Sequence, residues 1–261
     1  MNQLTAIAGC AALVVAVGCR SRPAAPPKQF DYQRERAVIE ARVMQIFTNA
    51  VLLKPRETVP STDPAFTLAP LLIREVADSN TSSNCGPATV FYHPGVVQIG
   101  GIARPQMSYL WSCGNENMSF RGVRLTLDSH GLPVIWEVLD DQPGARVVFV
   151  SQSLEERGRT AFGPPATGRR FAVEQPLSIA PDVVVARVND DGPVAMGPIV
   201  HQTASHEVNA IICRCMPTQA RQLVATVYYE LKPASVLTNV DLEIWGVNPR
   251  LADELRLPPN F

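Results

Sequence analysis

The feature that most constrains the fold is a series of short segments that alternate apolar and polar residues, separated by turn-forming residues. Residues 122–127, 132–139 and 146–150 are three such segments, and they are separated by Asp-Ser-His-Gly at 128–131 and Asp-Asp-Gln-Pro-Gly at 140–144. Alternation places successive side chains on opposite faces of a strand, and Gly, Asp and Pro favour tight turns. The pattern therefore predicts an antiparallel β-meander.

Further strand-like segments surround this meander. They are residues 89–92, 96–99, 106–113, 183–188, 194–200, 208–215, 223–231 and 240–247. We expect His-Pro-Gly at 93–95 to interrupt the first two, because Pro lacks the N–H that a strand donates. The Asn-Asp-Asp-Gly sequence at 189–192 predicts a hairpin that joins 183–188 to 194–200.

Three segments favour helices. Residues 30–53 carry apolar side chains at i, i+3 and i+4 spacing among Arg and Glu, which predicts an amphipathic N-terminal helix with Asp31 as its cap. A Ser-Leu-Glu-Glu capping box predicts a short helix at 153–162, and Asn-Pro at 248–249 introduces another at 250–255. The expected fold class is α+β, dominated by antiparallel sheet.

The composition indicates a folded chain without a strong electric field. Hydrophobic residues make up 46% of the chain and charged residues 18%, which is typical of a globular protein. Lys and Arg total 23 and Asp and Glu total 24, so no net charge attracts nucleic acid. We expect a single globular domain over residues 31–261 and no nucleic-acid partner.

The first residues have the character of a secretory signal. Residues 4–18 form an uncharged apolar run of about 15 residues, short of the roughly 20 that span a bilayer as a helix. The run ends in Val-Ala-Val-Gly before Cys19, which resembles the lipobox of bacterial lipoproteins. The resemblance implies removal of residues 1–18 and lipidation of Cys19, for example with palmitate. A second such sequence, Ile-Ala-Gly before Cys10, leaves too short an apolar run.

A Pro- and Ala-rich segment follows, over residues 20–30. Such composition favours an extended polyproline-like tether between a lipid on Cys19 and the domain. Arg20, a residue other than Asp after the lipidated Cys, resembles the signal for sorting to the outer membrane. We therefore expect a lipid-anchored protein of the cell envelope that faces the periplasm, with an envelope protein or peptidoglycan as partner.

Four cysteines remain in the domain: Cys85, Cys113, Cys213 and Cys215. An even number in an oxidising compartment favours disulfides. A direct bond between Cys213 and Cys215 would need a bent strand, so bonds to Cys85 and Cys113 are easier. Two alternatives stay open: four thiolates could hold a metal, and all four thiols could be free and buried.

The sequence Cys-Gly-Pro-Ala at 85–88 resembles the start of the nucleophile helix in papain-like cysteine peptidases of the bacteriocin-processing type. The resemblance implies a thiolate at Cys85 that a helix N-terminus and a downstream His would activate. The oxyanion Gln of that family is absent upstream, and Pro94-Gly95 leaves room for barely two helical turns.

Other candidate groups give weaker signals. His201 and His206 are five residues apart, a spacing that metal sites do not favour, and His93 and His130 stand alone. An arginine cluster around 157–170 could bind an anion or form a solvated face. The tryptophans at 111, 136 and 245 fall on strand-like segments and favour core packing. We find no phosphate loop, no Gly-x-Ser-x-Gly elbow and no His-Glu-x-x-His.

These observations favour a non-catalytic binding or assembly module, without a cofactor, anchored to a membrane by lipid. The alternatives are a papain-like hydrolase that uses Cys85 and a Cys-ligated metal-binding lipoprotein.

Overall fold

The computed structural model describes part of the chain. The described ranges are 30–43, 49–57, 60, 62–76, 89–113, 119–140, 145–177, 183–204, 207–213, 223–237 and 246–261, with the backbone alone at 112, 113, 119, 140 and 223–225. The contacts divide the chain into two units, 1–30 and 31–261, and the second unit is described below.

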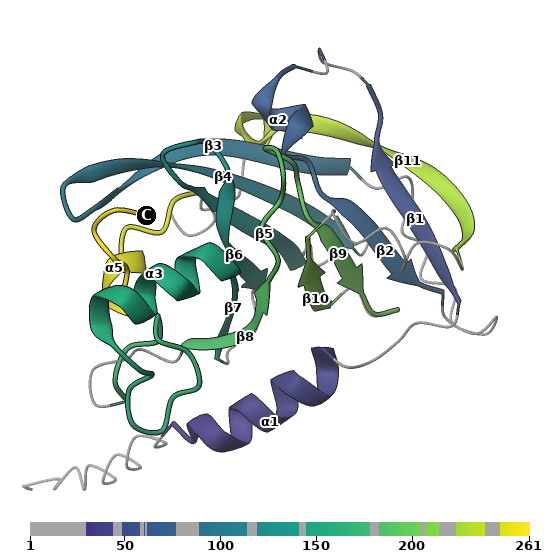
Figure 1. The fold of residues 1–261 in the computed structure, drawn as a ribbon. Helices are drawn as coiled ribbons and strands as arrows, with labels where there is room; N and C mark the ends of the chain where they lie inside the picture. Colours follow the sequence, from purple (N-terminus) through teal and green to yellow (C-terminus); the bar gives the residue numbers. More distant parts are fainter. Residues whose placement is uncertain are drawn as a thin grey trace, which may run out of the picture. The chain divides into compact units, whose positions relative to one another are not determined.

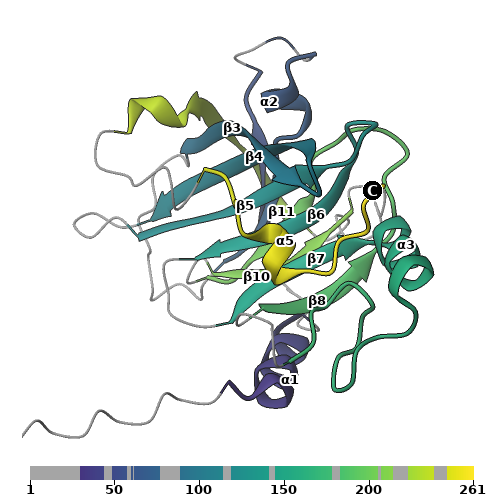
Figure 2. The same cartoon turned by 90° about the vertical axis from the view of Figure 1, so that its left-hand side faces the viewer.

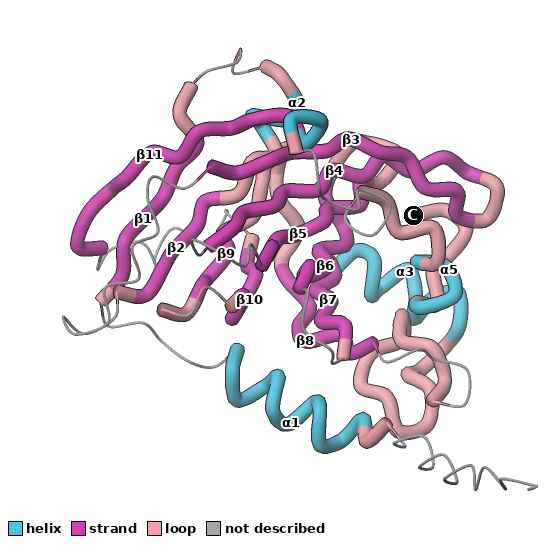
Figure 3. The backbone as a smooth tube through the Cα atoms, turned by 180° about the vertical axis from the view of Figure 1, so that it is seen from behind, coloured by secondary structure: helices cyan, strands magenta, loops and turns pink. Residues whose placement is uncertain are grey.

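The predicted α+β class is wrong, because the fold is mostly β. The described residues form one eleven-stranded sheet, in the order β10-β9-β2-β1-β11-β3-β4-β5-β6-β7-β8, which curls into a nearly closed, barrel-like layer (Figures 1 and 3). The strands are β1 Ala50–Pro55, β2 Leu71–Glu75, β3 Thr89–Ile99, β4 Ile102–Cys113, β5 Ser119–Leu127, β6 Pro133–Asp140, β7 Arg146–Ser151, β8 Val183–Asn189, β9 Ile199–Gln202, β10 Val208–Ile212 and β11 Leu223–Pro233. The helices are short: α1 Tyr32–Val43, α2 Pro64–Thr67, α3 Gln152–Phe162, η2 Ala234–Val236 and α5 Leu251–Glu254.

The predicted meander is present and larger than expected. Strands β3 to β7 pair with their neighbours in antiparallel register. β3 runs without a break through Pro94 and Gly95, contrary to the prediction, and turns into β4 at Gly100 and Gly101. Both glycines have positive φ, 58° and 82°, which residues without a Cβ adopt at no steric cost.

The predicted hairpin between residues 183–188 and 194–200 is not formed. β8 pairs in parallel with β7, after the crossover through α3, and β9 instead lies between β2 and β10. β11 lies between β1 and β3 and is parallel to both. Long-range pairing of this kind leaves no local signal in the sequence, since only the alternation of each strand is encoded locally.

The predicted N-terminal helix is shorter and buries a different face. It ends at Val43, and Ala50 already belongs to β1, where Leu53 pairs with Leu72 of β2. The buried residues of α1 are Tyr32, Arg36 and Ile39, whereas Val38 is 51% exposed. Polar partners beneath the helix therefore decide how it lies, rather than the apolar stripe.

The other two predicted helices are confirmed. α3 begins at Gln152 with Ser151 as its cap, so Ser153 of the predicted capping box lies inside the helix. α5 lies in a C-terminal segment, residues 246–261, that crosses the meander (Figure 2). One core cluster joins this segment to the sheet: Val97, Ile99, Val134, Ile135, Val148, Val150, Leu154, Val173, Val183, Val185, Leu251, Leu255 and Phe261.

Candidate functional site: a clamp at the edge of strand β8

The cysteines that carried most of the functional predictions are mainly outside the described residues. Cys19, Cys85 and Cys215 lie there, and Cys113 ends β4 without a described side chain. Cys213 follows β10 and is 5% exposed. The disulfide pairing, the metal site and the Cys85 nucleophile therefore stay predictions.

The histidines do not converge among the described residues. His93 lies in β3, His130 in the exposed turn before β6, and His201 in β9, while His206 is outside the described part. Burial lowers the pKa of His201 to about 4, so its imidazole is neutral at pH 7. Within the described ranges, no group of three or more His, Cys, Asp or Glu could hold a metal ion.

Each of the four arginines around α3 has its own partner within the protein. Arg157 donates to the Asn260 carbonyl, and Arg159 pairs with Glu155 one turn away. Arg170 pairs with Glu40 on α1. Arg169 is 9% exposed and donates to backbone carbonyls of Gln175 and Val183. Two of them, Arg169 and Arg170, belong to a larger cluster of buried polar groups around Glu174 and Tyr32.

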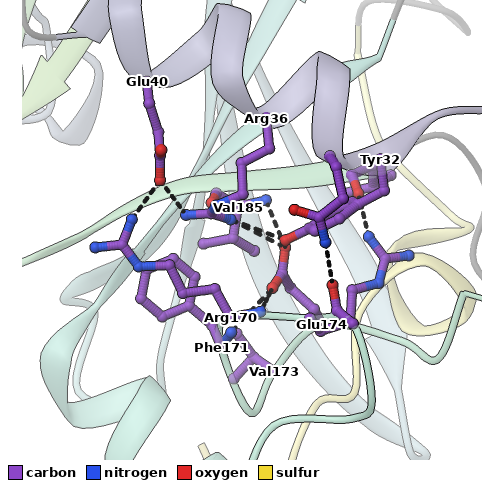
Figure 4. A network of polar contacts seen from close by, with 12 residues as sticks. Tyr32, Arg36, Glu40, Arg170, Phe171, Val173, Glu174 and Val185 are labelled. Carbon is purple, nitrogen blue, oxygen red and sulfur yellow. Dashed lines mark hydrogen bonds and ion pairs between the residues drawn. The ribbon is translucent and has the colours of Figure 1, made fainter.

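The centre of this cluster is Glu174, whose side chain is 1% exposed. Its Oε1 accepts from the Tyr32 hydroxyl at 2.7 Å and from the Val185 N–H at 3.1 Å. Its Oε2 accepts from the N–H groups of Arg170 and Phe171 at 3.0 and 2.9 Å. A buried carboxylate is tolerated only when donors surround it, and here each oxygen has two (Figure 4).

Arg36 brings the compensating positive charge from helix α1. Its Nη1 lies 3.9 Å from Glu174 Oε1 and donates to the Tyr32 hydroxyl at 2.8 Å. The guanidinium also stacks on the Phe171 ring, 5.4 Å from its centroid, and pairs with Glu40 at 2.9 Å. Burial raises the pKa of the Tyr32 phenol, and the Glu174 carboxylate raises it further.

The same side chains satisfy the free edge of β8. Because β8 is the last of the described strands in the sheet order, its outer backbone groups face no other described strand. Arg169 donates to the Val183 carbonyl at 3.1 Å, Arg36 donates to the Val185 carbonyl at 3.3 Å, and Glu174 accepts from the Val185 N–H. We call Tyr32, Arg36, Arg169 and Glu174 the edge clamp, since they take the place of a further strand.

Helix α1 also reaches the opposite edge of the sheet. It contacts both β8 and β10, the two terminal strands. The Asn189 side chain of β8 donates to the Ile211 carbonyl of β10 at 3.1 Å, so a side chain bridges the strands where they are not paired. The clamp thus fixes α1 over the seam of the nearly closed sheet.

A second buried cluster holds the C-terminal segment. Glu137 Oε1 accepts from Arg124 at 3.3 Å, from Arg146 at 2.8 Å and from the Asn248 amide at 2.8 Å. Asn248 also donates to Glu254 at 2.7 Å, and Arg146 pairs with Glu254. The charges of the two Glu and the two Arg cancel, and burial lowers the pKa of Arg124. The cluster binds residues 246–254 to the meander.

Sequence reasoning missed the clamp. Arg36 is one of the charged residues of the predicted amphipathic helix, and Glu174 stands in Ala-Val-Glu-Gln-Pro without any periodic pattern. No local signal identifies a carboxylate whose donors come from residues up to 142 positions away. Trp111 and Trp136 are 2% and 3% exposed, so both serve the core as predicted, while Trp245 is not described.

Neither the described helices nor the comparisons with known proteins identify a function or a family. Among the described residues, no helix combines the length and the apolar character that crossing a membrane requires. Comparisons with protein-family models, with curated proteins and with solved structures found no match.

Proposed function

We propose that this chain is a lipid-anchored cell-envelope protein, attached through Cys19, that acts as a non-catalytic binding or assembly module. The domain lies in the periplasm and is anchored to the outer membrane. Its partner is the membrane together with an envelope protein or peptidoglycan.

The observation that carries this proposal is how the first described helix, α1, is bound to the sheet. Helix α1 begins at Tyr32, directly after the predicted tether, and Tyr32 itself donates to the buried Glu174. A force applied through the tether therefore acts on a helix that is fixed to the sheet by buried hydrogen bonds and an ion pair. Such fastening suits a domain held at a membrane.

The chemistry of the described polar residues supports a role without catalysis. Both oxygens of Glu174 are occupied by protein donors, and His201 is too weak a base to act near neutral pH. The competing proposal is a hydrolase with Cys85 as nucleophile. Thiol alkylation of the full chain before and after reduction separates the two, since a nucleophile reacts first in the native state whereas a disulfide reacts only after reduction.

We further propose that the domain cysteines form disulfides that stabilise the sheet. The burial of Cys213 supports this proposal. Closing a loop of roughly 100 residues contributes a few kcal/mol in the chain-entropy account.

The anchoring is tested by comparing two cysteine variants in a bacterial host. Cells are labelled with an alkyne analogue of palmitate, and the envelope is fractionated. We expect the wild type and Cys10→Ser to be labelled and found with membranes, because Cys10 lies in the part that is removed. Cys19→Ser should lose both the label and the membrane association; a labelled Cys19→Ser protein would refute the assignment.

A further inference from the structure

The β3–β4 hairpin extends beyond the rest of the sheet as a two-stranded arm. β11 pairs with β3 only as far as Tyr92, and β5 pairs with β4 only from Gln106 onward. Residues 96–105 therefore pair only with each other, residues 93–95 pair only with β4, and the arm ends in Gly100 and Gly101 (Figure 1).

One face of this arm is covered by the protein. Val97 and Ile99 are buried against the C-terminal segment. Arg104, the only charged residue among 93–105, is 5% exposed and lies over the Phe261 ring, 4.8 Å from its centroid. This packing gives the arm a fixed shape before it meets a partner.

The remaining surface of the arm is exposed and uncharged. The exposed residues are Pro94, Val96, Gln98, Gly100, Gly101, Ile102, Ala103 and Pro105. The strand register places exposed Val96 on one face with Pro94, Gln98, Ala103 and Pro105, whereas Ile102 is exposed beside the Gly-Gly turn; Val96 is 56% and Ile102 is 40% exposed. An uncharged and largely apolar face on a protruding hairpin is unusual for a surface that meets only water.

We propose that this arm rests in the interfacial layer of the membrane to which the chain is anchored. The inference depends on the lipid anchor proposed above. The tether of residues 20–30 would span at most about 34 Å in polyproline geometry, at roughly 3.1 Å per residue, so an anchored domain stays close to the bilayer.

Two features favour lipid over a protein strand as the occupant, and a third sets the depth that the arm reaches. Pro94 and Pro105 cannot donate backbone hydrogen bonds, which disfavours the addition of a partner strand to either edge of the arm. The arm carries no Asp or Glu that anionic headgroups would repel. Its free backbone groups need hydrogen bonds, so it reaches the headgroup boundary and not the hydrocarbon centre.

The test places tryptophan on the exposed face of the arm, in the lipidated full chain bound to phosphatidylcholine–phosphatidylglycerol vesicles whose acyl chains are brominated near the glycerol. The probe is Val96→Trp. The matched control is Val194→Trp, because Val194 is 57% exposed and lies in the loop between β8 and β9. The native Trp111 and Trp136 are buried, and the wild-type chain measured in the same vesicles gives the background emission of all three native tryptophans. Ile102→Trp serves as a second probe should the first variant not fold.

We expect the Val96→Trp emission to shift to shorter wavelength and to lose intensity in brominated vesicles, while Val194→Trp emission stays unchanged. A chain that floats with the vesicles but shows no quenching at position 96 would overturn the arm proposal and leave the anchor intact. Equal quenching at both positions, or a shift that follows protein concentration without lipid, would also overturn it. A chain that does not float would refute the anchor itself, and the arm proposal with it.

Discussion

Replacement of Glu174 by Gln tests the edge clamp with minimal change in shape. The carboxylate accepts four hydrogen bonds, two at each oxygen, from Tyr32, Val185, Arg170 and Phe171. A Gln side chain keeps one carbonyl oxygen, but its amide group then points at two N–H donors and leaves them unsatisfied. Each buried unsatisfied donor costs about 1–3 kcal/mol, and the loss of one partner of a buried ion pair costs about 3–5 kcal/mol. Because these terms overlap, we expect a loss of about 3–5 kcal/mol in the free energy of unfolding.

The assay is urea unfolding of the full chain, followed by tryptophan fluorescence. The matched control is Glu40→Gln, because Glu40 also pairs with Arg36 but its side chain is 40% exposed. An exposed ion pair contributes about 0–1 kcal/mol, so the control should remain close to the wild type. Amide exchange should also accelerate at Val185 in the Glu174 variant. A loss no greater than that of the control would refute the assignment of Glu174 as the centre of the clamp.

Three further predictions concern single side chains. Tyr32→Phe should lower the free energy of unfolding by about 1–2 kcal/mol near pH 7. Because the pKa of Tyr32 is raised in the folded protein, the contribution of Tyr32 to stability should be complete below about pH 10 and fall as the pH rises above that. The Phe variant should lack this fall when urea unfolding is measured at alkaline pH. His201 has a pKa of about 4 in the folded protein, so its contribution to stability should be complete above about pH 6.5. The free energy of unfolding should then decrease by up to about 3 kcal/mol towards pH 4. Urea midpoints measured across this pH range should show a smaller decrease for His201→Gln and an unchanged decrease for His130→Gln. Gly122→Ala should lower the thermal midpoint, because its Cβ would overlap the Tyr109 carbonyl oxygen of β4; an unchanged midpoint would show that β4 and β5 can separate at no cost.

Local patterns in the sequence predict much of the meander. Alternation and turn residues correctly indicate β5, β6 and β7, and the helices α3 and α5 begin and end near their predicted residues. The errors lie where tertiary pairing outweighs local pattern. Residues 50–53 are predicted to end a helix, but they belong to β1, which pairs with β2 and β11. With β1 and β2 in the sheet and α1 shortened, the fold is mostly β instead of α+β.

The clamp could not be predicted, because its parts are separate in sequence and ordinary in type. Arg36 has the spacing of a solvated helix face, and it is buried only because Glu174 lies beneath it. The cysteine and anchor predictions rest on compartment chemistry and not on packing, so the fold of the described residues does not decide them. They require chemical tests on the protein itself.

The most direct test of the anchored-module account is the intact mass of the full chain extracted from membranes in detergent, with and without reduction. The account predicts a chain that begins at Cys19 and carries the added mass of lipid on that residue. It also predicts a mass lower than that of the reduced chain by two or four protons, with no thiol labelling before reduction. A chain without lipid, or with four thiols that label in the native state, would contradict the account.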